Sequence, residues 1–247
     1  LLFCCIILTS GISSAQEVKI AFFQAQPHIV YESGSGKISG ALYTFIEQYI
    51  APQMGVKFIW GSTPTNVPRQ LNLLENEKID ASAILILTKT REKKFCFTLK
   101  PFAQAKAVLG VLSDNKLTTI NKIEDILHLK IGYATNNYLS PFMRDDRIKF
   151  EFVFTGEPNE HNLKKLKLGR IDAVYLPDKA GLLSEIRLLS MEKMVNIIEL
   201  PDSPADLHVV FTKKNKKLAE RYNNAYQKVD GDRLYQKLLS EYLDIKP

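Results

Sequence analysis

Cysteine and histidine are both scarce in this chain of 247 residues, which has three cysteines and four scattered histidines. Cys4 and Cys5 lie in an apolar run at the start, so Cys96 has no partner for an internal disulfide once that run is removed. The sequence shows no histidine and cysteine cluster at metal-ligand spacing and no Ser/His/Asp order typical of a hydrolase. We therefore predict no catalytic residue, no metal site and no cofactor.

Long hydrophobic stretches are missing as well. Residues 1–8 are apolar, but a run of this length is too short to span a bilayer. Small residues follow as far as Ala15, which is the pattern of a secretory signal and its cleavage site. We predict a signal peptide over residues 1–15, cleavage after about Ala15, and a periplasmic location. A retained N-terminal anchor is the alternative, and lipidation of Cys4 or Cys5 stays open.

Neither sign of charge dominates, because the chain has 33 lysines and arginines and 27 acidic residues. The formal net charge is +6. The lysines are interspersed with acidic residues, and no basic stripe alternates with aromatic residues, which argues against a nucleic-acid partner. A mildly positive surface raises the encounter rate of an anionic ligand or favours an anionic membrane face. For most of these lysines, solubility alone is a sufficient explanation.

Residues 79–91 are the stretch around which the rest of the chain is organised. Their branched apolar part, without proline or glycine, is typical of a strand buried on both faces. It ends in the hydroxyls of Thr88 and Thr90 and the guanidinium of Arg91. Ligands of open α/β sheets bind outside the carboxyl ends of the strands, and this set of donors suits a small carboxylate. Alternatively, Arg91 opens a solvated stretch with residues 92–94.

A helix-turn-strand pattern occurs twice. Residues 71–81 are echoed by residues 163–173, and in both copies an amphipathic helix is followed by a basic residue and by Ile-Asp-Ala entering an apolar strand. A spacing of about ninety residues is too long for a solenoid and suits two similar α/β lobes that meet at a shared crevice. Chance similarity between two such units is the alternative.

We expect lobe 1 to comprise residues 16–108 and 209–247, and lobe 2 residues 109–208. The apolar run at 105–112 should cross from lobe 1 to lobe 2, and a strand at 207–211 should return. In lobe 2, Asn136 and Asn137 precede an expected short helix from about Tyr138. Backbone N–H groups at such a turn favour an anion, although Asn137 can equally serve as a helix cap.

Several short motifs, each weak alone, occur in an order that resembles the family-3 solute-binding proteins of bacterial ABC uptake systems. They occupy residues 36–40, 77–81, 88–91, 97–98, 101–102 and 168–173. The resemblance covers nearly the whole mature chain. It implies an α/β fold of the two-lobed periplasmic binding protein type (type II), with two sheets joined by two hinge crossovers.

The resemblance also implies roles for individual residues. In the family, an arginine after the first Ile-Asp-Ala strand clamps the ligand's carboxylate, and Arg91 matches it. An aspartate at the end of the second such strand holds the ligand's ammonium group; here Pro177 takes that place and Asp178 follows. The family's hydroxyls at the end of the first strand are replaced by Ile84 and Ile86. A Gly-Thr pair in the second lobe is replaced by Asn136 and Asn137.

We therefore predict an exported, monomeric protein that captures a small polar solute, an amino acid or a related carboxylate, between two lobes for ABC-type uptake, with a membrane permease complex as its partner. A binding module for a sensor or receptor is the alternative, and a dehydratase-like enzyme on the same fold is a weaker one. The predicted ligand-binding residues are Arg91, Thr90, Thr88, Asn136, Asn137, Asp178, Tyr175, Gln24, Gln26, Tyr31 and Trp60. For the aromatic residues, core packing is an equal alternative. We expect His28 to be a loop residue rather than a ligand or a base.

Overall fold

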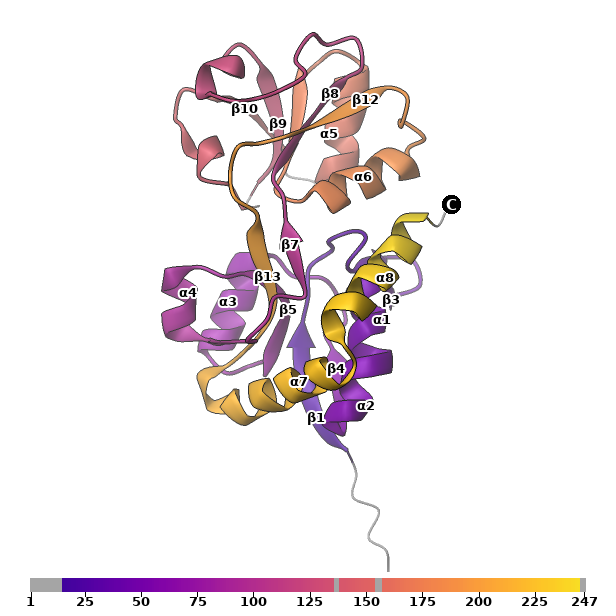
Figure 1. Ribbon diagram of the computed structural model, residues 1–247, viewed down its shortest axis with the longest axis vertical. Coiled ribbons are helices and arrows are strands. Elements are labelled where there is room, and N and C mark those ends of the chain that lie inside the picture. The colour runs from indigo at the N-terminus through magenta and orange to yellow at the C-terminus, as the bar shows by residue number, and fades with distance from the viewer. Residues whose placement is uncertain (1–14, 136–137, 154–156, 245–247) are drawn as a thin grey trace, which may run out of the picture.

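Two separate β-sheets form two lobes, one above the other in Figure 1. The structure is a computed structural model that describes residues 15–135, 138–153 and 157–244. The expected signal peptide therefore lies outside the described residues, apart from Ala15. Within those three ranges, every helix is too short or too polar to cross a membrane.

Lobe 1 is built on a mixed sheet with the strand order β4-β1-β5-β13-β6, and β7 also pairs with β13. Its strands are β1 (Gln16–Ala21), β4 (Val56–Trp60), β5 (Ala81–Ile86), β6 (Cys96–Phe97), β7 (Ala103–Ala105) and β13 (Ala205–Phe211). A hairpin pairs β2 (Val30–Glu32) with β3 (Lys37–Ser39). The helices are α1 (Ala41–Thr44), which continues through the π-helical η1 (Phe45–Ile50) into α2 (Ala51–Met54), then α3 (Val67–Glu75), α4 (Lys89–Lys94), the 3₁₀ turn η4 (Lys213–Asn215), α7 (Lys216–Lys228) and α8 (Gly231–Asp244).

Lobe 2 has a second mixed sheet with the order β10-β9-β11-β8-β12. Its strands are β8 (Val108–Leu112), β9 (Lys130–Ala134), β10 (Lys149–Val153), β11 (Ala173–Leu176) and β12 (Val195–Glu199). Its helices are α5 (Pro158–Lys167) and α6 (Lys179–Leu188), with 3₁₀ turns η2 (Ile123–Asp125) and η3 (Phe142–Arg144). The fold predicted from the sequence, two α/β sheets in two lobes, is confirmed.

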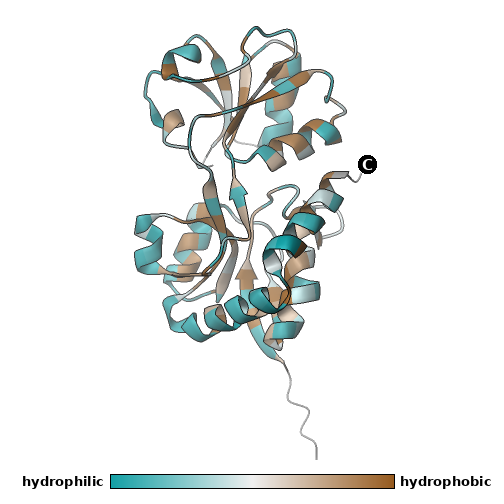
Figure 2. Ribbon diagram, viewed as in Figure 1, coloured by the Kyte–Doolittle hydropathy of each residue, from teal (hydrophilic) through white to brown (hydrophobic). Residues whose placement is uncertain are grey.

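Hydrophobic residues gather in the strands of both sheets, whereas the outward faces of the helices are hydrophilic (Figure 2). Lobe 1 has a large core that includes the fully buried Phe22, Phe45 and Tyr235. Lobe 2 has one core on each face of its sheet. Because side chains alternate along a strand, Tyr175 of β11 belongs to one of these cores and Leu176 to the other. The core of lobe 1 is separate from both of these, so each lobe has its own hydrophobic core.

Two chain segments connect the lobes (Figure 1). One leads from β7 to β8, and the other leads from β12 to β13. Strand β13 starts at Ala205 and pairs with β5 and β7 of lobe 1, so the return to lobe 1 begins before the expected residue 209. Val108 pairs with Leu176 and Glu199 of lobe 2, so it belongs there rather than to lobe 1.

The repeated Ile-Asp-Ala motif has the same contacts in both lobes. In lobe 1 the carboxylate of Asp80 accepts a hydrogen bond from Lys19 N at 2.8 Å, and Asp80 N donates to Lys19 O at 2.8 Å. In lobe 2 the corresponding pair is Asp172 and Lys130, at 2.7 Å and 2.9 Å. Each aspartate thus fixes the entry of its strand against the neighbouring strand, β1 or β9.

The short helix expected from about Tyr138 is absent at the described residues there. After β9 the chain from Tyr138 to Ser140 has no regular structure, and the first helical turn is η3. Ser140 N donates to Tyr175 Oη at 3.0 Å, and Tyr175 Oη donates to Tyr138 O at 3.0 Å, so a buried tyrosine holds this segment instead of a helix.

Candidate functional site

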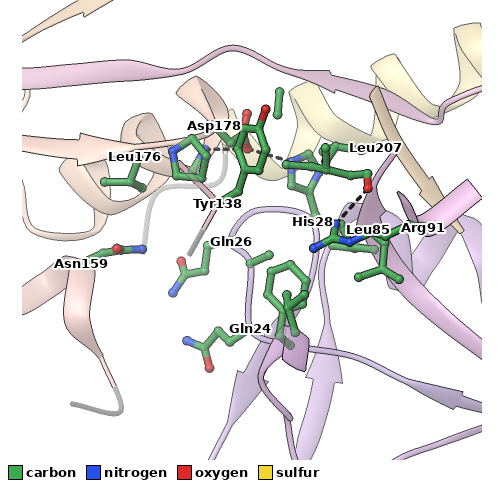
Figure 3. A pocket seen from close by; sticks show the side chains of 18 residues that line it. Gln24, Gln26, His28, Leu85, Arg91, Tyr138, Asn159, Leu176, Asp178 and Leu207 are labelled. Atoms are coloured by element: carbon green, nitrogen blue, oxygen red, sulfur yellow. Dashed lines mark hydrogen bonds and ion pairs between the residues drawn. The ribbon is translucent and has the colours of Figure 1, made fainter. Parts of the chain in front are cut away.

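A cavity of about 180 Å³ lies between the two lobes, at the ends of β5 and β11. Lobe 1 lines it with Phe23, Gln24, Ala25, Gln26, His28, Val67, Ile84, Leu85, Ile86, Arg91, Ala105 and Leu207, and lobe 2 with Tyr138, Asn159, Leu176, Pro177, Asp178 and Gly181. Figure 3 shows the polar side chains of both lobes turned toward this space. The cavity is therefore apolar over much of its wall, with a few polar groups at defined places.

Arg91 is the cation of the cavity. It sits in α4, directly after β5, and its backbone N–H donates to the N-cap hydroxyl of Thr88 at 3.3 Å. Its Nη1 donates to Ile86 O at 2.9 Å, which directs the guanidinium back over the end of the strand (Figure 3). Burial lowers the pKa of Arg91 from its usual value. In the described parts of the chain Arg91 forms no ion pair, so its charge has no carboxylate partner among those residues.

Asp178 lies opposite, at the start of α6 in lobe 2. Its carboxylate caps the helix by accepting from Ala180 N at 3.3 Å and from Gly181 N at 3.1 Å. Pro177 ends β11 just before it and also lines the cavity.

His28 joins the two lobes at this point. Its Nε2 lies 3.0 Å from Asp178 Oδ2 (Figure 3). Its Nδ1 lies 2.5 Å from Tyr235 Oη of α8. The imidazole is only 3% exposed and packs against Phe102 and Tyr235. It is a loop residue, as expected, but a buried one whose two nitrogens both have partners. The loop that carries Gln24 and Gln26 therefore also supplies an inter-lobe contact.

The chain matches the model of the bacterial extracellular solute-binding proteins, family 3, over residues 18–245. The chain belongs to this family. No curated protein matches it. Among solved structures, an ancestral arginine-binding protein bound to arginine is 22% identical with a TM-score of 0.74, covering 93% of this chain and 99% of that one. This likeness confirms the fold.

Two further solved structures have the same fold. The amino acid ABC transporter substrate-binding protein AbpA of Streptococcus pneumoniae, bound to L-arginine, is 20% identical with a TM-score of 0.73 and covers 93% of this chain and 94% of that one. The periplasmic domain of BvgS from Bordetella pertussis is 16% identical with a TM-score of 0.73, covering 94% of this chain and 44% of that one. The first is named as a transporter component and the second is not.

Four of the predicted residues of this family 3 protein line the cavity together: Arg91, Asp178, Gln24 and Gln26. Gln26 also accepts a hydrogen bond from Ser184 Oγ of lobe 2 at 3.4 Å. Asn136 and Asn137 lie outside the described residues.

The other predicted residues do not line the cavity. Thr88 caps α4, and Thr90 is exposed on the outer side of that helix. Tyr31 Oη donates to Ser62 O at 3.2 Å, and Trp60 Nε1 donates to Glu47 at 2.7 Å, both within lobe 1. Tyr175 is buried in the core of lobe 2. These three aromatic residues therefore pack in or against the core of their own lobe, which is the alternative that the sequence left open.

His28, Tyr138 and Asn159 line the cavity although sequence reasoning did not select them. His28 shares a loop with two amides that were selected, and Tyr138 directly follows the two asparagines. Asn159 opens α5, which follows β10, so it belongs to the same edge of the sheet as the other strand ends. Behind it, burial raises the pKa of Glu185 from 4.5 to about 7, and a hydrogen bond from Asn159 opposes that shift. No group of three metal-ligating side chains occurs among the described residues.

Proposed function

We propose that this family 3 protein captures a small carboxylate solute in the cavity between its lobes, with Arg91 as the anchor of the carboxylate. The observation that carries the proposal is a half-buried guanidinium that faces the cavity and has no carboxylate partner in the described chain. Charges removed from water are stable only when they are paired, so an anionic group in the cavity completes the site.

The geometry of Arg91 supports a fork-shaped contact. One N–H of Nη1 is used by Ile86 O, which fixes the orientation of the guanidinium, and the remaining donors are available to two carboxylate oxygens. The neighbouring walls are Ile84, Leu85 and Leu207, which exclude water and strengthen such a contact. Gln24, Gln26 and Asn159 supply amides that orient the body of the solute.

Capture requires the lobes to separate and close. The two connecting segments, 106–107 and 200–204, are the places where a hinge can operate, because each lobe has its own core. In the structure the lobes touch through His28 with Asp178 and through Arg187, whose Nη1 donates to Leu243 O. We propose that solute binding favours this arrangement.

Arg91→Ala tests the proposal directly. Removing one partner of a desolvated charged pair costs about 2–5 kcal/mol, so calorimetry should show at least a thirtyfold loss of affinity for the bound carboxylate. Arg91→Lys keeps the charge but not the fork and should retain part of the affinity. Lys93→Ala, on the exposed side of the same helix, is the matched control and should bind normally. Unchanged binding by the Arg91→Ala protein would exclude this residue as the anchor.

For the setting of this activity, we propose a periplasmic, monomeric protein that delivers its solute to a membrane permease complex and does not convert it. The solved relatives bound to arginine support a solute of amino-acid size. The likeness to the BvgS periplasmic domain supports a sensor as the alternative partner. Mass spectrometry of the solute after incubation tests the absence of turnover, since a changed mass would favour an enzyme on this fold. Crosslinking in membranes from the native host tests the partner.

A further inference from the structure

We propose that the cavity selects a small carboxylate with an uncharged body, such as a 2-hydroxy or 2-oxo acid, over the α-amino acid of the same carbon skeleton. This inference rests on the proposed function, because it assumes that Arg91 holds the carboxylate. It adds that the second charged group of an amino acid has no place in the site.

An ammonium group in this cavity would depend on Asp178, which is the one carboxylate among the described lining residues. The oxygens of Asp178 are already engaged. Oδ1 accepts from Ala180 N, and Oδ2 accepts from Gly181 N and faces His28 Nε2. A carboxylate has about four acceptor positions, so three of them are filled by the protein itself. His28 Nε2 and Gly181 N therefore take both acceptor positions of Oδ2, and a single position, on Oδ1, is left for an ammonium.

His28 cannot easily move away. Its Nδ1 is bonded to Tyr235 Oη, and its ring lies parallel to Tyr235 at a centroid distance of 6.1 Å and edge-on to Phe102 at 6.0 Å. Its backbone oxygen accepts from Leu42 N at 2.8 Å. The tautomer with hydrogen on Nε2 donates to Asp178 and accepts from Tyr235, which satisfies both nitrogens. Displacing it would leave a buried donor without a partner.

The rest of the wall suits an uncharged body. The side chains of Phe23, Val67, Ile84 and Leu176 are apolar, and they make up much of the lining together with Leu207. The amides of Gln24, Gln26 and Asn159 both donate and accept, so a hydroxyl or a carbonyl on the solute can be paired. Among the described residues, Asn159 Oδ1 is buried and has no hydrogen-bond partner. Glu185 lies behind Asn159 and is not part of the lining.

Matched sets of acids test the selection. Calorimetry with the mature protein compares alanine with lactate and pyruvate, leucine with 2-hydroxy-4-methylpentanoate and 4-methyl-2-oxopentanoate, and phenylalanine with phenyllactate and phenylpyruvate. Within the set that fits the cavity, the hydroxy or oxo acid should bind at least tenfold more tightly than the amino acid. Arginine and glutamine are included and should bind more weakly than the best of these acids.

Variants at His28 identify the cause. His28→Ala frees a second acceptor position of Asp178, on Oδ2, so the preference for the uncharged acid over the amino acid should fall at least tenfold. His28→Gln retains an uncharged donor near Asp178 and should keep more of the native preference. Circular dichroism melts establish that each variant is folded. If either variant is unfolded, the comparison of acids on the native protein still decides the proposal.

Each outcome has a distinct meaning. If the amino acid of a set binds as tightly as its partners and this binding needs Arg91, the inference is overturned while the proposed function stands. If no hydroxy or oxo acid binds, the inference is overturned as well. The proposed function is also overturned if, in addition, the native protein binds no amino acid and no dicarboxylate, or if such binding survives in the Arg91→Ala protein. Equal preference in the native and His28→Ala proteins removes His28 as the selecting residue.

Discussion

His28 Nε2 of lobe 1 and Asp178 Oδ2 of lobe 2 lie 3.0 Å apart, although 150 positions separate the two residues in the chain. The histidine is fixed from behind by Tyr235, and the aspartate is fixed by the first N–H groups of α6. Two rigid groups therefore meet across the inter-lobe gap. Such a contact forms in one relative position of the lobes and is lost in others, so we expect it to mark the arrangement that solute binding favours.

The capping role of Asp178 can be separated from its contact with His28. Replacing an N-cap aspartate by alanine costs about 1 kcal/mol, whereas asparagine is as good a cap. Asp178→Ala should therefore lower the free energy of unfolding by about 1–2 kcal/mol in urea titrations, and Asp178→Asn should lower it by less than half as much. Equal losses in the two variants would show that the cap contributes little.

Gly181 of α6 lies against the loop of Gln26 in lobe 1. A Cβ added there would lie 3.2 Å from Gln26 O of lobe 1 and 3.6 Å from Asp178 Oδ2. Gly181→Ala should weaken solute binding several-fold and Gly181→Val about tenfold, because the side chain acts as a wedge against closure. Small-angle scattering at saturating solute should show a larger radius of gyration for the valine variant.

The matched control for this wedge is Gly34→Ala, since a Cβ at Gly34 meets nothing within 4 Å. That variant should bind and scatter like the native protein. Native affinity in the Gly181→Val protein would mean that closure does not bring α6 against the loop of Gln26.

The fold could be predicted because its signals are local and occur twice. Asp80 and Asp172 each bind the backbone of a lysine in the neighbouring strand, so a single three-residue motif marks the same structural event in both lobes. The apolar run of β5 is buried from Ala81 to Leu85, as its composition indicates. The exact position of the lobe boundary near residue 205 was harder to predict from the sequence, because it depends on which sheet β13 joins.

The site could be predicted only in part. Arg91 and Asp178 directly follow apolar strands, and position alone brings them to the crevice. Tyr175 also ends such a strand, but it points into the core while the next residue, Leu176, lines the cavity. A shift of one residue reverses the face, and sequence does not fix that register. The role of His28 depends on Tyr235, more than two hundred residues away, which no local pattern reveals.

The two helix-to-strand turns of the repeat differ in one residue that should matter for stability. Glu77 has φ 53° and the equivalent Gly169 has φ 64°, both in the left-handed region. A side chain there costs about 1–2 kcal/mol. Glu77→Gly should therefore raise the free energy of unfolding by about 0.5–1 kcal/mol, after loss of the exposed ion pair with Lys214. Gly169→Ala should lower it by about 1 kcal/mol.

Glu77→Ala is the control for this pair of variants. It removes the same ion pair with Lys214 but keeps a Cβ in the left-handed conformation, so it should show no gain. Urea unfolding of the Glu77→Gly, Glu77→Ala and Gly169→Ala proteins gives the three free energies of unfolding, and each is compared with that of the native protein. A gain in the alanine variant equal to that of the glycine variant would attribute the effect to charge rather than to backbone strain.

Glu185 should make stability depend on pH. Its carboxyl has a usual pKa of 4.5, and burial raises the folded value to about 7. Between these values the folded protein keeps a proton that the unfolded chain has released, so the free energy of unfolding falls as pH rises from about 4.5 to 7. Above pH 7 the full penalty is present, and it is at most about 3 kcal/mol for a shift of this size.

Glu185→Gln removes that penalty, because an amide has the same shape and carries no charge. The variant and the native protein should have similar melting temperatures at pH 4.5, and the variant should become progressively more stable up to pH 7.5. Taking the difference between the two proteins cancels the contribution of other titrating groups. Glu192→Gln, at an exposed position in the same lobe, is the matched control for the change from carboxylate to amide. A flat difference for Glu185→Gln would mean that this carboxyl ionises in the folded protein as it does in water.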